Sequence, residues 1–322
     1  MFLSRKLIIF FIILFLPLQS HALFGLAGRA EQKQKISAAR KAYKEGDYQE
    51  SINICRDFLI QNQDAPKRRA RRIYVILGDA YAALGDYDHA LLTYNEALEV
   101  LPKDISLNLA LANLYYKTEL YDKAIEFYNK VLKLDEDNPN ALLGLGRAYL
   151  QTGFLSKSRQ YFQDYLSEED QAESSAYYDY AVANFLSNNN DIAMEYALKA
   201  EKADKNNPDI YFLIAKIYNA LNDEKQAEEN INKALMLDGN RQDIFLTSLL
   251  WKAYKPQNAS EVLNEIKAYQ KQNPSSQLAI CIEGTALLTE GEKQKAITVF
   301  KKIQKQNEES FIKEVATKIV NN

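Results

Sequence analysis

Residues 71–102 read RRIYVILGDAYAALGDYDHALLTYNEALEVLP, and this stretch decides the fold. Its first half carries apolar residues at helical spacing, namely Ile73, Tyr74, Leu77 and Tyr81. Gly85-Asp86 interrupts this pattern, and a second apolar stripe of the same period follows. The stretch therefore predicts a helical hairpin. Because a single hairpin cannot bury its outer apolar face, it also predicts neighbours of the same length stacked on it.

The same stretch resembles one unit of the tetratricopeptide repeat (TPR) family at each diagnostic position. Those positions hold Tyr74, Leu77-Gly78, Tyr81, Ala90, Tyr94, Ala97 and Pro102. Gly78 and Ala90 are small where the two helices would cross, which lets the backbones approach closely. The resemblance implies an all-α fold, a right-handed TPR superhelix of about eight helical hairpins with a C-terminal capping helix.

The pattern recurs along residues 32–310. We expect eight repeats of 34 residues, beginning at residues 32, 71, 105, 139, 174, 208, 243 and 277. The first repeat is atypical and suits a terminal cap, and the seventh is degenerate because Leu250 replaces the small crossing residue. Residues 311–322 predict an amphipathic capping helix and tail. Since no strand pattern or long linker interrupts the repeats, we expect one continuous superhelix without a second domain.

Residues 1–22 predict a secretory signal peptide. Basic Arg5-Lys6 precedes the apolar run LIIFFIILFLPL, and small residues near the end of the segment frame a cleavage point. Residues 23–31 form a short lead before the repeats. We therefore expect an exported protein of a bacterial periplasm. The alternative is an uncleaved anchor over residues 7–26 that would hold the protein in the inner membrane.

The composition gives little support for catalysis or metal binding. The chain of 322 residues has two histidines and two cysteines, and its net charge of −3 gives no case for nucleic-acid binding. The common hydrolase, metalloprotease and phosphate-binding motifs are missing from the sequence. Cys55 is expected in the core and His89 on the surface. We therefore expect no enzyme activity, no cofactor, no metal and no small-molecule substrate.

In TPR proteins the first helix of each repeat lines a concave groove, and the resemblance implies a set of partner-binding residues here. They are Asn113, Arg147, Tyr178, Phe185, Phe212, Trp251 and Tyr254. Aromatic side chains often supply most of the binding energy for a protein or peptide partner. The alternative is that these rings pack between repeats. The carboxylate clamp of some TPR co-chaperones is not reproduced, because Val75 and Leu109 stand where it needs lysine.

A basic run fills the insert between the first two repeats, with Lys67, Arg68, Arg69, Arg71 and Arg72. Positive charge at the start of a helix opposes the helix dipole, so the run breaks a local rule. It is either a solvated surface or an anion-facing patch. The sequence thus favours a non-enzymatic scaffold of the cell envelope that binds a protein or peptide in its groove. The alternative function is a module that binds a membrane surface or an envelope polymer through residues 67–72.

Overall fold

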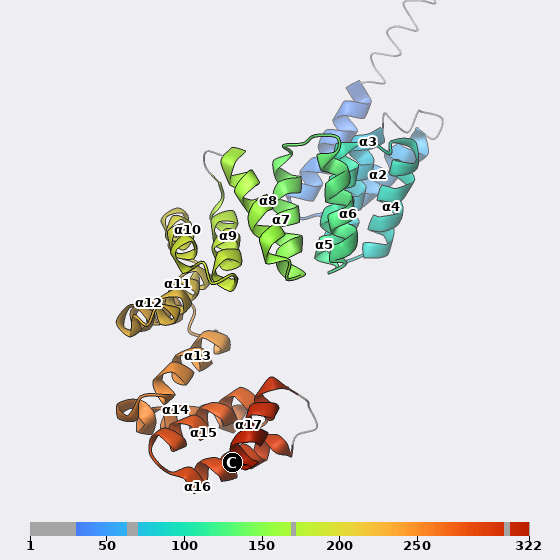
Figure 1. Ribbon diagram of the computed structural model, residues 1–322. Helices are drawn as coiled ribbons and strands as arrows, with labels where there is room; N and C mark the ends of the chain where they lie inside the picture. The colour runs from blue at the N-terminus through green and yellow to red at the C-terminus, as the bar shows by residue number, and fades with distance from the viewer. Residues whose placement is uncertain (1–29, 63–69, 169–171, 306–309, 322) are drawn as a thin grey trace, which may run out of the picture. The chain divides into compact units, whose positions relative to one another are not determined.

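The computed structural model describes residues 30–62, 70–168, 172–305 and 310–321. These residues form helices joined by short turns, with no strand among them (Figure 1). Within the same ranges, no helix is both long enough and apolar enough to span a bilayer. The predicted signal peptide, residues 1–22, lies outside them. The chain divides into two compact units, Met1–Gln171 and Ala172–Asn322, which we call the amino-terminal and carboxy-terminal units. The continuous superhelix over 32–310 stays a prediction.

The amino-terminal unit is a stack of antiparallel helix pairs. Its helices are residues 30–44, α2 (Tyr48–Gln61), α3 (Arg71–Ala83), α4 (Tyr87–Val100), α5 (Ile105–Lys117), α6 (Tyr121–Leu132), α7 (Pro139–Gln151) and α8 (Leu155–Glu168). Helices α3 and α4 pack as one pair, α5 and α6 as the next, and α7 and α8 as the last (Figure 1). Large buried side chains fill the space within and between the pairs, among them Phe58, Ile73, Tyr94 and Leu107.

The carboxy-terminal unit continues the same construction with one irregular pair. Its helices are α9 (Ser174–Leu186), α10 (Asn190–Ala203), α11 (Pro208–Ala220), α12 (Glu224–Leu237), α13 (Gln242–Ala253), α14 (Ala259–Gln272), α15 (Gln277–Thr289), α16 (Lys293–Gln304) and α17 (Phe311–Asn321). The 3-10 turn η2 (Pro256–Asn258) separates α13 from α14. The last helix, α17, packs on α15 and α16 and buries Ala316 against the core.

The turn inside most of the hairpins, the pair α13 and α14 excepted, has the same left-handed conformation at one residue. Gly85 has a φ of 81°, a left-handed value that costs glycine little, and the following Asp86 caps α4 by accepting a hydrogen bond from the His89 amide at 3.3 Å. Other hairpins use the same left-handed position without glycine, at Glu119, Asn188 and Asn222. At Glu119 that conformation costs roughly 1–2 kcal/mol, so packing of the two helices imposes the turn there, whereas asparagine adopts it more readily.

In three of the described pairs, α3–α4, α7–α8 and α15–α16, the helices cross where a ring meets a glycine. A Cβ atom added to Gly78 would lie 2.3 Å from Cε1 of Tyr94, which is 1% exposed. The same arrangement joins Gly146 to Phe162 and Gly284 to Phe300. The small crossing residue predicted at Gly78 is therefore required by the ring of the second helix, which occupies the space that a larger residue would need.

The two cysteines are free thiols in the described part of the chain. Cys55 is fully buried, as expected for a core position, and burial raises its pKa to about 12. Cys281 is half-buried, and burial raises its pKa as well. A thiol with a raised pKa is protonated near neutral pH and is a poor nucleophile, so packing explains both residues.

Candidate binding surfaces

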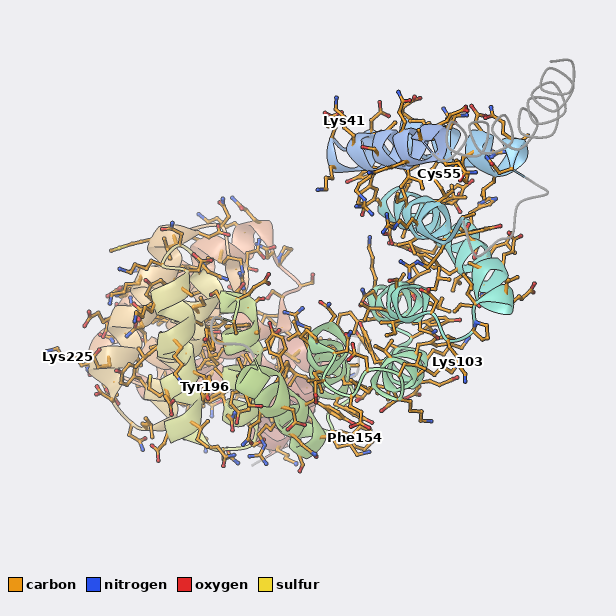
Figure 2. All side chains as sticks on the ribbon, turned by 90° about the horizontal axis from the view of Figure 1, so that it is seen from above. Lys41, Cys55, Lys103, Phe154, Tyr196 and Lys225 are labelled. Carbon is orange, nitrogen blue, oxygen red and sulfur yellow. The ribbon has the colours of Figure 1, made fainter. Side chains whose placement is uncertain are left out.

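Two neighbouring hollows lie on the first helices of the amino-terminal hairpins. The helices of this unit follow a curve in Figure 2. The first hollow, of about 290 Å³, is lined by Arg40, Lys44 and Arg72 among other residues. The second, of about 200 Å³, is lined by Asn113 and Lys117. Both hollows also have Tyr43 and Asp79 in their walls, so they form one surface along the helix over residues 30–44, α3 and α5.

Buried tyrosines donate hydrogen bonds from the core to polar side chains of this surface. The Tyr94 hydroxyl donates to Oδ1 of Asp79 at 2.5 Å, and the Tyr128 hydroxyl donates to Oδ1 of Asn113 at 2.6 Å. Burial raises the pKa of Asp79, and the hydrogen bond from Tyr94 opposes that rise. Burial also raises the pKa of Tyr128, and the positive charge of Arg147 opposes that rise. The predicted groove residue Asn113 is therefore hydrogen-bonded to Tyr128, and the charge of Arg147 is near enough to act on the Tyr128 hydroxyl.

The first hollow carries more positive than negative charge. Arg71 is paired, since its Nη1 lies 3.1 Å from Oδ2 of Asp104. Arg40, Lys44 and Arg72 are exposed, and none of them has an ion pair or hydrogen bond with another described residue. Lys67, Arg68 and Arg69 of the predicted basic patch lie outside the described residues. The patch is thus represented in the structure by Arg71 and Arg72.

A different pocket, of about 400 Å³, opens between α11, α12 and α13 in the carboxy-terminal unit. It is lined by two of the predicted anchors, Trp251 and Tyr254. Tyr254 is 67% exposed and Trp251 is half-buried. The small side chains of Ala227 and Ser248 also line the pocket and leave space beside the indole ring. An aromatic wall that is partly open to water suits an apolar side chain of a partner.

Both lysines that line this pocket are paired with carboxylates. Lys255 lies 2.8 Å from Glu224, and Lys252 lies 3.2 Å from Glu261. Elsewhere in the unit, Arg241 bridges Asp209 at 2.9 Å and Asp243 at 2.8 Å. Exposed pairs of this kind contribute little to stability, but they leave few uncompensated charges beside the pocket.

The other predicted anchors are less open. Phe212 is 7% exposed, and Nζ of Lys216 lies 3.8 Å from the centre of its ring. Tyr178 and Phe185 are half-buried and pack on the core formed by α9, α10 and α11. Burial, with the charges of Asp209 and Asp179, raises the pKa of Tyr178 to about 12. Phe212 would contact a partner only after Lys216 moves away, so its role as an anchor stays a prediction.

Arg40 and Lys44 were not predicted from the sequence as groove residues, although their spacing and their place in the repeat indicate it. The two residues are four apart on the helix over residues 30–44, so they share one face. Arg40 also holds the place in the first repeat that Asp79 and Asn113 hold in the next two. The first repeat lacks the aromatic signature, which favours a terminal cap and gives no indication of a groove face there. The described residues hold no group of three or more His, Cys, Asp or Glu placed for a metal ion.

Three stretches of the sequence match known repeats. Residues 78–119 and 120–153 match the family described as TPR repeat, and residues 208–241 match the family described as tetratricopeptide repeat. A comparison with curated proteins gives no match.

Solved structures share the fold at low sequence identity. A tetratricopeptide repeat protein from Parabacteroides merdae is 18% identical with a TM-score of 0.55, over 90% of this chain and 97% of that chain. YrrB, a TPR protein described as having an unusual peptide-binding site, is 16% identical with a TM-score of 0.50, over 59% of this chain and 95% of its own. A chain of the APC/C hetero-tetramer Cut9-Hcn1 is 12% identical with a TM-score of 0.58, over 85% of this chain and 52% of that chain.

At these identities the likeness concerns the fold alone. The predicted all-α class is confirmed by the helices of both units, and the predicted repeat type is confirmed by the three matched stretches. The chain is therefore a tetratricopeptide repeat protein with an all-α solenoid fold.

Proposed function

We propose that this protein is a non-enzymatic scaffold of the cell envelope that binds a segment of a partner protein. The observation that carries the proposal is the pocket of about 400 Å³ walled by Trp251 and Tyr254. Two large rings bordering an open pocket give a partner side chain apolar area to cover. The solved relative with a peptide-binding site and the relative found in a hetero-tetramer support a protein partner for this fold.

The envelope location rests on the sequence of residues 1–22. A basic start followed by a long apolar run is typical of a secretory signal. Mass spectrometry of the protein isolated from cell fractions tests it. A mature chain that begins near Leu23 in the periplasmic fraction supports export with cleavage. A full-length chain in the inner-membrane fraction supports the anchor over residues 7–26, and a full-length chain in the cytoplasm contradicts both.

Peptide selection tests the pocket. A phage-displayed library of random peptides is selected against the purified protein, and the dissociation of each selected peptide is then followed from the wild type and from variants. We expect Trp251→Ala and Tyr254→Ala to speed dissociation by about tenfold, the effect of an anchor of about 1.4 kcal/mol. Association should change little, because neither ring carries charge.

Met236→Ala is the matched control for a change in exposed apolar surface. Met236 lies on α12, the same helix that supplies one wall of the pocket, and is 85% exposed without lining the pocket. Selected peptides that leave Trp251→Ala, Tyr254→Ala and Met236→Ala at equal rates would remove the pocket from the proposal. Failure to select any peptide would count against the scaffold function itself.

A further inference from the structure

We propose that the first hollow of the amino-terminal unit binds an acidic segment of the partner protein, with Arg40, Lys44 and Arg72 holding its carboxylates. This inference rests on the proposed scaffold function, because it names the chemistry of a segment that such a scaffold would bind. It concerns described residues only, and the basic residues 67–69 take no part in it.

Three positively charged side chains from two helices line the same hollow. Arg40 and Lys44 come from the helix over residues 30–44 and Arg72 comes from α3, yet all three line one hollow of about 290 Å³. Like charges that share a hollow repel one another, and a hollow lined by one sign of charge attracts ions of the opposite sign. Folding alone gives no reason to place here three cations that have no partner among the described residues. An anionic ligand would compensate them.

The remaining groups of the hollow favour a carboxylate on a peptide. Arginine holds a carboxylate through two parallel hydrogen bonds, and two of the three cations are arginines. Tyr43 and Val75 line the same hollow and offer apolar contacts to the methylene groups of Asp or Glu. Asp79, the carboxylate already present, is hydrogen-bonded to Tyr94. One held carboxylate does not balance three cations, so the hollow keeps a positive charge.

The neighbouring hollow extends the binding surface. It shares Tyr43 and Asp79 with the first hollow and adds Asn113 and Lys117. Nζ of Lys117 donates to the Ala82 carbonyl oxygen at 3.2 Å, which holds this cation beside the surface. An extended segment that runs from one hollow to the next would thus place a second polar or acidic side chain near Asn113 and Lys117. A stretch of chain can run across two hollows that share Tyr43 and Asp79 in their walls.

The experiment uses the peptide selection described above, repeated at low salt. We expect the selected peptides to be enriched in Asp and Glu, and to lose affinity by about tenfold when their acids are replaced by the matching amides. The combined variant Arg40→Gln, Lys44→Gln and Arg72→Gln should bind the selected peptides about tenfold more weakly than the wild type does. It should also show a weaker dependence of the association rate on salt, because the charges that attract the peptide are gone.

A second triple variant controls for the loss of three charges. Lys41→Gln, Lys133→Gln and Lys225→Gln removes three exposed lysines that line neither hollow, and Lys41 and Lys225 are labelled in Figure 2. This variant should keep the affinity of the wild type to within about twofold. An equal loss in both triple variants would overturn the inference, because net charge rather than the hollow would then explain binding.

Two further outcomes separate this inference from the function on which it rests. The selected peptides could lack acidic enrichment, depend on Trp251 and bind the hollow variant as tightly as the wild type. That result would overturn the inference and leave the scaffold function standing. No selected peptide at all would remove both. If the hollow variant instead loses binding to vesicles that contain anionic lipid while keeping its affinity for peptides, the cations serve a membrane surface and the inference is wrong.

Discussion

The hollow of the amino-terminal unit and the pocket of the carboxy-terminal unit are built on the same kind of hairpin but use tyrosine differently. Tyr94 is 1% exposed and reaches the second hollow from the core, where its hydroxyl donates to Asp79, a residue that lines both hollows. Tyr254 is 67% exposed and forms part of the pocket wall itself. The first hollow has cations without described partners, whereas Lys255 beside the pocket is paired. A ring near a binding surface is thus a core residue in one unit and a surface residue in the other.

The largest expected effect is the difference between these two tyrosines. Tyr94→Ala should lower the free energy of unfolding by about 3–5 kcal/mol, because it empties a buried aromatic site and leaves Asp79 without its donor. Tyr254→Ala should stay within about 0.5 kcal/mol. Circular dichroism during urea unfolding measures both. Fluorescence does not replace it, since the single tryptophan, Trp251, reports on the carboxy-terminal unit alone. Equal unfolding midpoints would break the comparison.

A smaller effect tests the crossing that places Tyr94. Gly78→Leu should destabilise the protein by about 1–3 kcal/mol, because the added atoms meet a ring that has no room to move away. His89→Ala is the control within the same hairpin. His89 is exposed, stacks on Tyr81 with ring centres 5.1 Å apart and contacts Asp86, so its loss should cost about 0.5 kcal/mol or less. If the two variants melt at the same temperature, the alignment of this repeat is wrong.

The smallest effect concerns the dependence of stability on pH. Burial raises the pKa of Asp79 above its ordinary value of 3.8, so the folded protein holds that proton more tightly than the unfolded chain. Stability from this group is therefore present at low pH and is lost as the pH rises through the raised pKa. Asp79→Asn keeps an acceptor for Tyr94, as Asn113 does for Tyr128, and removes the titration.

The urea midpoint of the wild type and of Asp79→Asn, measured from acidic to neutral pH, checks this expectation. As the pH rises from about 4, the stability of the variant should increase relative to that of the wild type. Parallel curves would mean that the carboxylate of Asp79 is not penalised by burial. Asn113→Asp is the reciprocal variant. It should make the stability of the neighbouring helix pair fall in the same way as the pH rises.

The crossings were predictable from the sequence because they depend on size alone. A small residue at Gly78 and a ring at Tyr94 fall at fixed places in the repeat, and the structure joins them. The left-handed turn was predictable at Gly85 for the same local reason. It was not predictable at Glu119, because packing of α5 against α6 imposes a conformation that the side chain disfavours.

The candidate binding surfaces were only partly predictable. Position along the helix placed Phe212 in the groove, but burial of a ring depends on its neighbours, and Lys216 covers this one. Trp251 and Tyr254 do line an open pocket, whose existence depends on small side chains contributed by other helices. The cationic side chains of Arg40 and Lys44 were not predicted, because the first repeat lacks the aromatic residue that marks the register of the others. Which side chains meet across repeats is a property of the assembled stack.

The ring that enters a glycine gap also bears on how the chain folds. Tyr94 and Asp79 are fifteen residues apart in the sequence, and so are Tyr128 and Asn113. Closing so short a loop costs little chain entropy, and proteins dominated by such local contacts fold quickly. We expect each helix pair of this kind to form early and the pairs to assemble afterwards. Pulse-labelled hydrogen exchange would then protect α3 together with α4 before the surfaces between pairs close, so a nascent chain could begin folding one hairpin at a time.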